Sequence, residues 1–347
     1  MLFIRQEIKN IPLNNMTKVM VFGATGTVGA YTCLYLAERG YEVIAVGHRE
    51  SDNGFFAEHG MTYYSVDISN PSDFDKLPTD VESIVHLAGL LPARMKGYSP
   101  QKYIDVNMTG SLNILLFVEK IGVKSLIYSQ SIADVAYLCG SKTPIPSDAE
   151  PRFPINNDHT VYSITKTATV NLIKHYSDRC GFKYYILRLP NIYLYHPNPM
   201  YYVDGVERWM SYRLMIHLAQ NGEPISIWGD PDKVRDIVYI KDCCQIIERC
   251  IASGAESGTY NVGTGVGTTM REQVEGIVKV FSPKNKPSKI SYDPSKPDAV
   301  EYIFDISKTC KNLGYKPKYN YIEYLKDFKK ELEAETFSKL WGTNLDV

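Results

Sequence analysis

The chain has 347 residues, of which 44% are hydrophobic and 22% charged, the usage of an ordinary soluble globular protein. Its 38 basic and 39 acidic side chains leave a formal net charge of -1, which argues against nucleic acid or a membrane surface as a partner. The seven cysteines form no CxxC pair, so we expect neither disulfides nor a metal site. No apolar stretch reaches the roughly 18 residues of a membrane span, and residues 1–15 lack the apolar core of a secretory signal. We therefore expect a cytoplasmic protein.

Short β-rich apolar runs alternate with helical patterns through the first half of the chain. Strands are predicted at 18–22, 42–46, 62–66, 83–87, 124–128 and 183–188, and helices at 27–39, 101–120 and 160–179. Such alternation indicates parallel strands joined by right-handed crossovers. The expected fold class is α/β, with a Rossmann-like doubly wound parallel sheet.

The pattern changes after Pro190, where the chain becomes rich in Tyr, His, Asn and Pro. One more strand is predicted at 259–262, helices at 269–281 and 321–336, and an irregular connection at 283–300. We expect a dinucleotide-binding domain from 16–190 with 236–263, and a smaller C-terminal substrate-binding lobe from 191–235 with 264–347. Residues 1–15 are assigned to an N-terminal extension.

Three glycines follow the first predicted strand at regular spacing. Gly23, Gly26 and Gly29 stand in the run Gly23-Ala24-Thr25-Gly26-Thr27-Val28-Gly29, which opens the first helix. Such a turn lets the backbone approach a phosphate, and the helix N-terminus attracts the anion. A plain βα turn also uses glycine, but its place between strand and helix favours dinucleotide binding.

The end of the second strand distinguishes NAD from NADP. An acidic residue there would bind the ribose 2′-hydroxyl, whereas a cation would accept a 2′-phosphate. The chain has His48 and Arg49 and no acid, which favours NADP over NAD, although Arg49 could also be a solvated loop charge. Asp67, at the end of the third strand, either reaches the adenine edge or caps the turn that follows it.

A tyrosine and a lysine four residues apart are the candidate catalytic pair. Tyr162 and Lys166 share one face of the helix predicted at 160–179, where a nearby ammonium would lower the pKa of the phenol. Ser131 follows the fifth strand at the carboxyl edge of the sheet and could hydrogen-bond the reacting oxygen. It could instead be a turn serine that bonds its own backbone.

Further motifs continue this series in a fixed order. They are His86-Leu87-Ala88-Gly89, Val106-Asn107-Met108-Thr109-Gly110, Arg188-Leu189-Pro190-Asn191-Ile192-Tyr193, Val234-Arg235-Asp236-Ile237-Val238-Tyr239 and Tyr260-Asn261-Val262-Gly263. Together with the glycine turn, the chain from about 17 to 330 resembles the extended short-chain dehydrogenases/reductases, in the NAD-dependent epimerase/dehydratase family that modifies nucleotide sugars.

The resemblance implies a role for each matching residue. Ser131, Tyr162 and Lys166 would be catalytic, and Ser131, Asn191 and Arg235 would bind a nucleoside-diphosphate sugar, with Arg235 at its phosphates. The residues expected to line the cofactor are Gly23, Thr25, Gly26, Thr27, Val28, Gly29, His48, Arg49, Asp67, Ile68, Leu87, Ala88, Gly89, Asn107, Ser129, Tyr162, Lys166 and Pro190. Family members often dimerise through two helices that here would span 101–120 and 160–179, so a homodimer is expected.

The residues after Ser131 narrow the chemistry. Family dehydratases carry Asp-Glu there, whereas this chain has Ile132-Ala133 and an acid only at Asp134, which disfavours dehydration and decarboxylation. Epimerisation through a transient ketone and net reduction of a ketosugar by NADPH both remain. A reductase of non-nucleotide carbonyls is a further alternative, and a cofactor-binding regulator without activity is disfavoured by the intact catalytic set.

Overall fold

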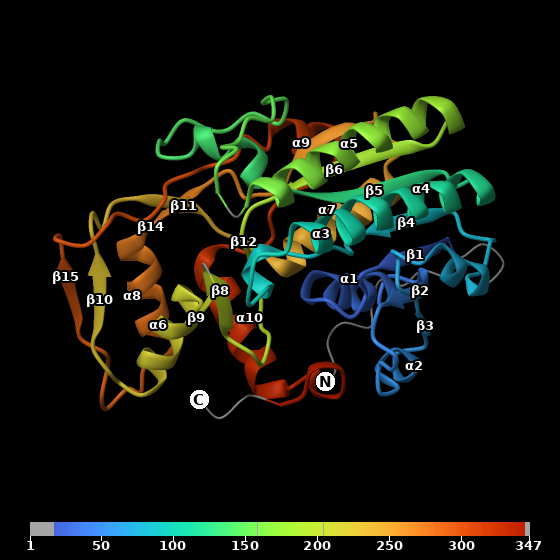
Figure 1. Ribbon diagram of the computed structural model, residues 1–347. Helices are drawn as coiled ribbons and strands as arrows, with labels where there is room; N and C mark the ends of the chain where they lie inside the picture. Colours follow the sequence, from blue (N-terminus) through green and yellow to red (C-terminus); the bar gives the residue numbers. More distant parts are fainter. Residues whose placement is uncertain (1–16, 158, 204, 344–347) are drawn as a thin grey trace.

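The computed structural model describes residues 17–157, 159–203 and 205–343, so the N-terminal extension assigned to 1–15 lies outside the described residues. A seven-stranded sheet forms the larger half of the molecule, in the order β13-β6-β5-β4-β1-β2-β3 (Figure 1). Its strands are β1 (Lys18–Phe22), β2 (Glu42–Gly47), β3 (Thr62–Ser65), β4 (Ser83–His86), β5 (Ser125–Ser131), β6 (Lys183–Leu189) and β13 (Gly258–Asn261). All neighbouring strands are parallel, which confirms the predicted fold class.

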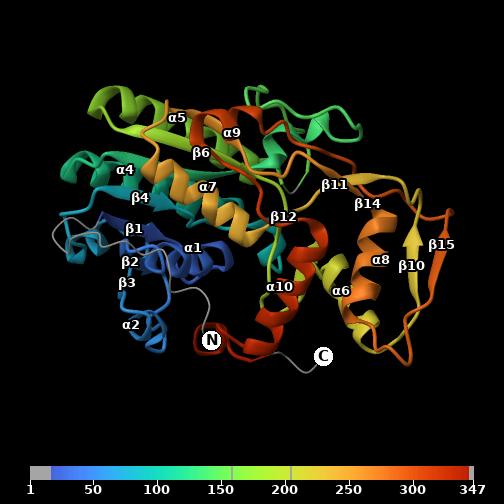
Figure 2. The same cartoon turned by 180° about the vertical axis from the view of Figure 1, so that it is seen from behind.

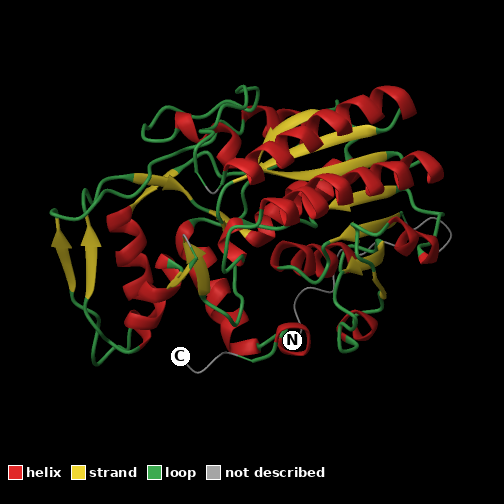
Figure 3. Ribbon diagram, in the orientation of Figure 1, coloured by secondary structure: helices red, strands yellow, loops and turns green. Residues whose placement is uncertain are grey.

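Alternate side chains of each strand enter two separate apolar layers. In β1, Val19 and Val21 pack in one layer with helices α1 (Thr27–Ala37) and α7 (Ile240–Ala252). Met20 and Phe22 pack in the other with α4 (Gly110–Ile121) and α5 (Thr160–Cys180). Helices therefore cover both faces of the sheet, as Figure 3 shows in red and yellow.

The strand order reverses between β1 and β4, since β2 and β3 lie to one side of β1 and later strands lie to the other. Ligands of open α/β sheets bind at such a switch point, beyond the carboxyl ends of the strands. Short elements follow these strand ends: α2 (Phe55–Glu58), η1 (Pro71–Lys76), η2 (Pro92–Arg94) and η4 (Ile132–Leu138). The fold thus directs the glycine turn and the loops after β4 and β5 to one edge.

The smaller lobe is built on three helices, α6 (Ser211–Gln220), α8 (Met270–Phe281) and α10 (Tyr321–Ala334), and is seen from behind in Figure 2. Four strand pairs flank them: β7 (Ile192–Tyr193) with β12 (Val238–Tyr239), β8 (Met200–Val203) with β9 (Val206–Trp209), β10 (Ile225–Trp228) with β15 (Ile290–Asp293), and β11 (Val234–Asp236) with β14 (Gly267–Thr269). Capping boxes begin α8 at Thr269 and α10 at Asn320. Two short helices flank α10 in the sequence: α9 (Ser307–Leu313) precedes it and α11 (Ser338–Trp341) follows it. The boundaries assigned to the two domains stay a prediction.

The structure corrects two predicted elements. The helix expected at 101–120 is α3 (Pro100–Tyr103), a π-helical segment η3 (Ile104–Thr109) and α4 in succession. The irregular connection expected at 283–300 contains β15, because its residues pair with β10 far earlier in the chain. π-Helical turns are costly and often occur at functional sites, and this one contains Asn107.

Candidate active site

The glycine turn has no room for side chains at two of its positions. A Cβ on Gly23, whose φ is +85°, would lie 2.6 Å from the backbone nitrogen of Ala88, and one on Gly29 would lie 2.0 Å from the carbonyl oxygen of Gly23. Gly26 precedes α1, whose first residues are Thr27 and Val28, and the first turn contains no acidic residue and no side-chain cap. The free N–H groups at this helix start suit a dinucleotide phosphate.

The tip of β2 is arranged differently from the expectation, whereas Asp67 after β3 follows one of its two expected alternatives. His48 is exposed, and the guanidinium of Arg49 donates a hydrogen bond to the carbonyl oxygen of Leu340 in α11. Asp67 accepts hydrogen bonds from the backbone N–H and the hydroxyl of Ser69, at 2.9 and 2.7 Å, so it caps the turn. Ile68 is buried. The preference for NADP therefore loses its main support, since Arg49 is engaged within the chain.

The loop after β4 is fixed to the π-helical segment. Asn107 donates to the carbonyl of Leu90 at 3.1 Å and accepts from its N–H at 2.7 Å, so the loop containing Leu87, Ala88 and Gly89 is held in place. The backbone carbonyl of Asn107 accepts from the Thr169 hydroxyl of α5 at 2.9 Å. This expected cofactor residue thus connects the loop to the helix of the catalytic pair.

Tyr162 lies 5% exposed on α5, and the hydroxyl of Ser131 interacts with its phenol. Burial raises the pKa of the Tyr162 phenol to about 12, and the Ser131 contact acts in the opposite direction. Ser131 also accepts a hydrogen bond from the N–H of Ala133, which is the contact expected of a turn serine, and its catalytic role stays a prediction. Ser129 lies two residues before Ser131 on β5, and its hydroxyl is 3.5 Å from the carbonyl oxygen of His86.

Lys166 is a buried cation without an anionic partner. Its side chain is 6% exposed, and its ammonium lies 4.0 Å from the ring centre of Tyr128. In the described part of the chain it has no hydrogen bond or ion pair, and burial lowers its pKa to about 7. Its N–H donors are therefore left for a ligand, and burying the ammonium completely without one would be costly. The expected ribose of a bound cofactor would be such a ligand.

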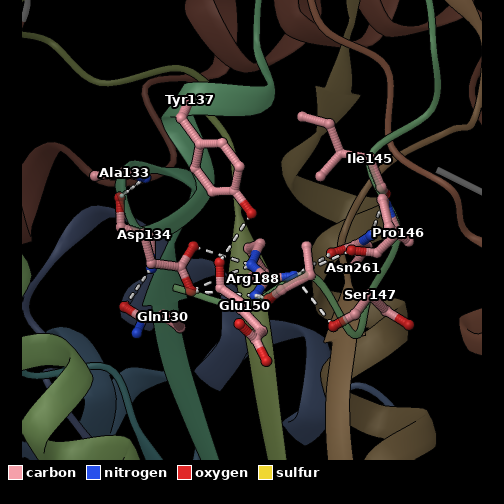
Figure 4. Close-up of polar contacts among 12 residues, drawn as sticks. Gln130, Ala133, Asp134, Tyr137, Ile145, Pro146, Ser147, Glu150, Arg188 and Asn261 are labelled. Atoms are coloured by element: carbon pink, nitrogen blue, oxygen red, sulfur yellow. Dashed lines mark hydrogen bonds and ion pairs between the residues drawn. The ribbon is translucent and has the colours of Figure 1, made fainter. Parts of the chain in front are cut away.

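Figure 4 shows a second buried cation, Arg188, whose guanidinium donates hydrogen bonds to several acceptors of the protein. Arg188 on β6 donates to both oxygens of Asp134, with the shortest contact at 3.0 Å. It also donates to Asn261 and to the carbonyls of Pro146, Ser147 and Ala149. The motif that contains Arg188 gave no indication of this hydrogen-bond network. Its acceptors lie 39 to 73 residues away in the sequence, so the signal in the sequence was an arginine inside an apolar strand.

Two of the expected substrate residues, Asn191 and Arg235, lie close in sequence to the paired strands β7 and β12. Pro190 is buried and Asn191 is exposed between β6 and β7, and β7 pairs with β12 just beyond Arg235. Arg235 donates to the carbonyl of Val300 at 2.9 Å, and burial raises the pKa of the Tyr193 phenol while the nearby Arg235 acts in the opposite direction.

The two carboxylates nearest to Arg235 in sequence are engaged elsewhere. Asp232 pairs with Arg271, while Asp236 is buried and accepts from Thr264, Gly265 and Phe304. Within residues 17–343, apart from 158 and 204, no carboxylate pairs with Arg235. Neither neighbouring carboxylate therefore holds Arg235 in an ion pair, and the guanidinium keeps donors for an anion.

A pocket that the sequence analysis missed lies beside the tyrosine. It is lined by Pro92, Met95, Gly97, Tyr98, Tyr103, His159, Tyr202 and Gly205. Tyr103 packs edge-on against Tyr162, with ring centres 6.1 Å apart. The pocket thus joins the loop after β4, α3 and the β8–β9 hairpin next to the candidate acid–base group.

The model of the NAD dependent epimerase/dehydratase family matches residues 19–263. The chain belongs to this family. The resemblance inferred from the motif series is confirmed, and the NAD-dependent epimerase/dehydratase assignment covers the whole sheet described above.

Relatives match over most of their length. The UDP-glucose 4-epimerase of Bacillus subtilis is 26% identical over 328 residues, covering 86% of this chain and 92% of the relative. That of Dictyostelium discoideum is 27% identical over 337 residues, covering 89% and 94%. Two solved structures share the fold. The UDP-glucose 4-epimerase of Thermotoga maritima with UDP-glucose has a TM-score of 0.71 at 24% identity, covering 91% and 99%. The UDP-glucuronic acid 4-epimerase of Bacillus cereus with UDP-glucuronic acid and NAD has a TM-score of 0.70 at 21% identity, covering 91% and 100%.

The described residues show neither a helix that could span a membrane nor a cluster that could hold a metal ion. Over residues 17–343, without 158 and 204, no helix has the length and apolar character needed to cross a membrane. Over the same residues, no group of three or more His, Cys, Asp or Glu side chains is placed to hold a metal ion.

Proposed function

We propose that this family member is an NAD-dependent 4-epimerase of a UDP-linked sugar. The observation that supports this most directly is the contact of Tyr162 with Ser131 beside the unpaired Lys166, at the carboxyl edge next to the glycine turn. The curated relatives named above are UDP-glucose 4-epimerases, and both structural neighbours bind UDP-sugars. Hydride transfer at a sugar carbon is consistent with this arrangement of side chains and with the named relatives.

The residues of this chain divide the proton chemistry between them. Bound NAD would supply a hydride acceptor and a positive charge beside the tyrosine. Tyr162 takes the proton of the sugar hydroxyl as the ketone forms, and returns it to the oxygen once the opposite face is presented. Ser131 holds that oxygen, while Lys166 binds the cofactor ribose and stabilises the phenolate.

The cofactor proposal changes from the sequence-based preference. Arg49 is bonded to Leu340, and the B. cereus neighbour binds NAD, so NAD replaces NADP as the proposed cofactor. The steric demands at Gly23 and Gly29 and the uncapped start of α1 fit a dinucleotide of either kind. NADP dependence is the outcome that would restore the earlier preference.

The nearest acid after Ser131 does not supply dehydratase chemistry in this arrangement. The Asp134 carboxylate is 3% exposed and holds Arg188 with both oxygens. Extracting it would leave the guanidinium unpaired in the interior. This supports epimerisation over elimination of water.

The proposed substrate spans both lobes. The Arg235 guanidinium, lacking a carboxylate partner among the described residues, would bind the diphosphate, with Asn191 as a hydrogen-bond partner. The pocket beside Tyr103 would take the sugar. A neutral carbonyl substrate would not need the free guanidinium.

The decisive experiment needs no added cofactor. Purified protein is incubated with UDP-glucose, UDP-galactose or UDP-glucuronic acid, and the sugars are separated chromatographically. Interconversion at C4 without net formation of NADH is expected. Consumption of NADPH with a UDP-ketosugar would instead identify a reductase, and inertness toward every UDP-sugar would refute the proposal.

We also propose a homodimer through α3–α4 and α5. Four apolar side chains on these elements are exposed, namely Ile104, Met108, Leu116 and Ile164, at 37–47%. The exposure of Ile164 on α5 leaves this side chain available to a partner subunit. Light scattering that shows a monomer at micromolar concentration would contradict this proposal.

A further inference from the structure

The C-terminal helix α11 leaves its own lobe and packs against the dinucleotide half. Figures 1 and 2 show the red chain running from the end of α10 to a position below α1 and beside α2. Phe337 and Leu340, each 1% exposed, anchor it. The Phe337 ring lies 4.4 Å from that of Tyr31 on α1 and 5.6 Å from that of Phe55 on α2.

Trp341 contacts the glycine turn itself. Its indole N–H donates to the carbonyl oxygen of Thr25 at 3.0 Å. The indole ring stacks on Phe337, with centres 4.3 Å apart, and packs against the tilted ring of His196, with centres 4.7 Å apart. The turn that would hold the cofactor phosphate is therefore hydrogen-bonded to the end of the described chain.

The same helix holds the tip of β2. Its backbone carbonyls at Leu340 and Lys339 accept from Arg49 and from the Asn53 amide, the latter at 2.9 Å. The tip of β2 is where this fold contacts the adenosine ribose. One short helix thus joins two backbone segments that surround the adenosine side of the cofactor site.

The surroundings of Trp341 are strongly cationic. Arg213 donates to the carbonyl of His196, Arg94 to that of Met200, and Arg49 to that of Leu340, and over the described ranges none of the three has an ion pair. Burial, followed by these three guanidinium groups, lowers the pKa of His196 to about 4. Three cations satisfied by neutral carbonyls leave a positive potential that favours a nearby phosphate.

We propose that α11 is a clasp that retains the dinucleotide, with Trp341 as the positioning residue that holds the glycine turn. The inference rests on the proposed cofactor. An epimerase needs such retention, because the cofactor reduced in the first half of the reaction must be reoxidised on the same sugar in the second. The clasp fixes the adenosine side of the site, away from the reacting carbon at Tyr162.

The test measures retention rather than turnover. Wild type and variants are loaded with NAD, passed through gel filtration and diluted into an NAD-degrading enzyme as a trap, and bound NAD is quantified over time. Trp341→Ala should release NAD about tenfold faster, and Trp341→Phe, which keeps a ring but loses the N–H, about threefold faster. Lys339→Ala is the matched control on the same helix, since its ion pair with Glu58 is exposed and contributes little.

Thermal unfolding of the same samples without NAD separates retention from stability. The expected result is faster release from Trp341→Phe with an unfolding temperature near that of wild type and of Lys339→Ala. Equal release rates for wild type and both Trp341 variants would overturn the clasp. A wild type that retains NAD but converts no UDP-sugar would overturn the proposed function and leave the clasp standing, whereas a wild type that binds no NAD would overturn both.

Discussion

Two buried cations lie on neighbouring elements and differ in whether the protein supplies hydrogen-bond acceptors for them. Arg188 on β6 is 2% exposed and has a carboxylate, an amide oxygen and three carbonyls as acceptors. Lys166 on α5 is 6% exposed, and among the described residues its ammonium contacts the ring of Tyr128 and no hydrogen-bond acceptor. A cation whose donors are all used stabilises its surroundings, whereas one left unsatisfied is retained at a cost. The comparison separates a group with a structural explanation from a candidate functional group without reference to any motif.

The largest effect is expected where the unsatisfied cation supports chemistry. Tyr162→Phe should lower kcat by about 10²–10⁴-fold, because the phenol oxygen that moves the proton is lost while the ring still packs against Tyr103. NAD content of the purified variant should stay at the wild-type level. Lys166→Met should reduce both turnover and NAD content, since the ammonium has two proposed roles. Steady-state kinetics with quantified cofactor would show the split, and a Tyr162→Phe variant with wild-type kcat would refute the assignment of the acid–base group.

Breaking the satisfied cation should affect folding instead. Arg188→Met leaves the Asp134 carboxylate buried without its partner, so the free energy of unfolding should fall by about 3–5 kcal/mol. Urea denaturation followed by tryptophan fluorescence measures this.

A matched surface pair provides the control for that loss. Arg179→Met removes the exposed pair with Glu119 and should cost less than about 1 kcal/mol. If both variants lose the same stability, the buried network contributes no more than a surface pair. The contrast with Lys166 would then fail.

The same reasoning extends to arginines in the smaller lobe. Arg235 has no carboxylate partner in the described chain, whereas Arg271 is paired with Asp232 on the surface. Arg235→Ala should weaken UDP binding by roughly 1.5–3 kcal/mol, the range for a hydrogen bond to a charged group. Arg271→Ala should leave the affinity close to that of wild type. Isothermal titration with UDP compares them, and equal losses would show that pairing does not distinguish the two sites.

How far the sequence predicts this molecule depends on the range of the interactions. The strands β1–β6 and the steric need for Gly23 and Gly29 follow from local pattern, so they were predicted close to their observed positions. The parallel pairing of β10 with β15 and the bond between Arg49 and Leu340, 291 residues apart, depend on contacts that no local pattern encodes.

Helical spacing likewise could not tell which face of α5 meets the sheet. Ile164 fits an apolar stripe, yet the buried face contains Thr165, Thr169 and Ile173. Small hydroxyl residues pack there because α5 lies close to η3, where Thr169 bonds the carbonyl of Asn107. Polarity alone therefore gave the wrong orientation for part of this helix, while Tyr162 and Lys166 were placed correctly on one face.

The pH dependence of folding tests the unsatisfied cation directly. Burial lowers the pKa of Lys166 from 10.5 to about 7 in the folded state. Between these values the unfolded chain binds a proton that the folded chain has released, so the free energy of unfolding rises with pH from about 7 to 10.5. Below pH 7 both states hold the proton, and this gain in stability is absent. For one proton the slope reaches at most about 1.4 kcal/mol per pH unit. The experiment compares urea denaturation of NAD-free wild type and Lys166→Met across that range, so that other titrating groups cancel. The difference between the two should shift in favour of wild type as the pH rises; a constant difference would mean that the buried ammonium keeps an ordinary pKa, and that some contact satisfies it as fully as Arg188 is satisfied.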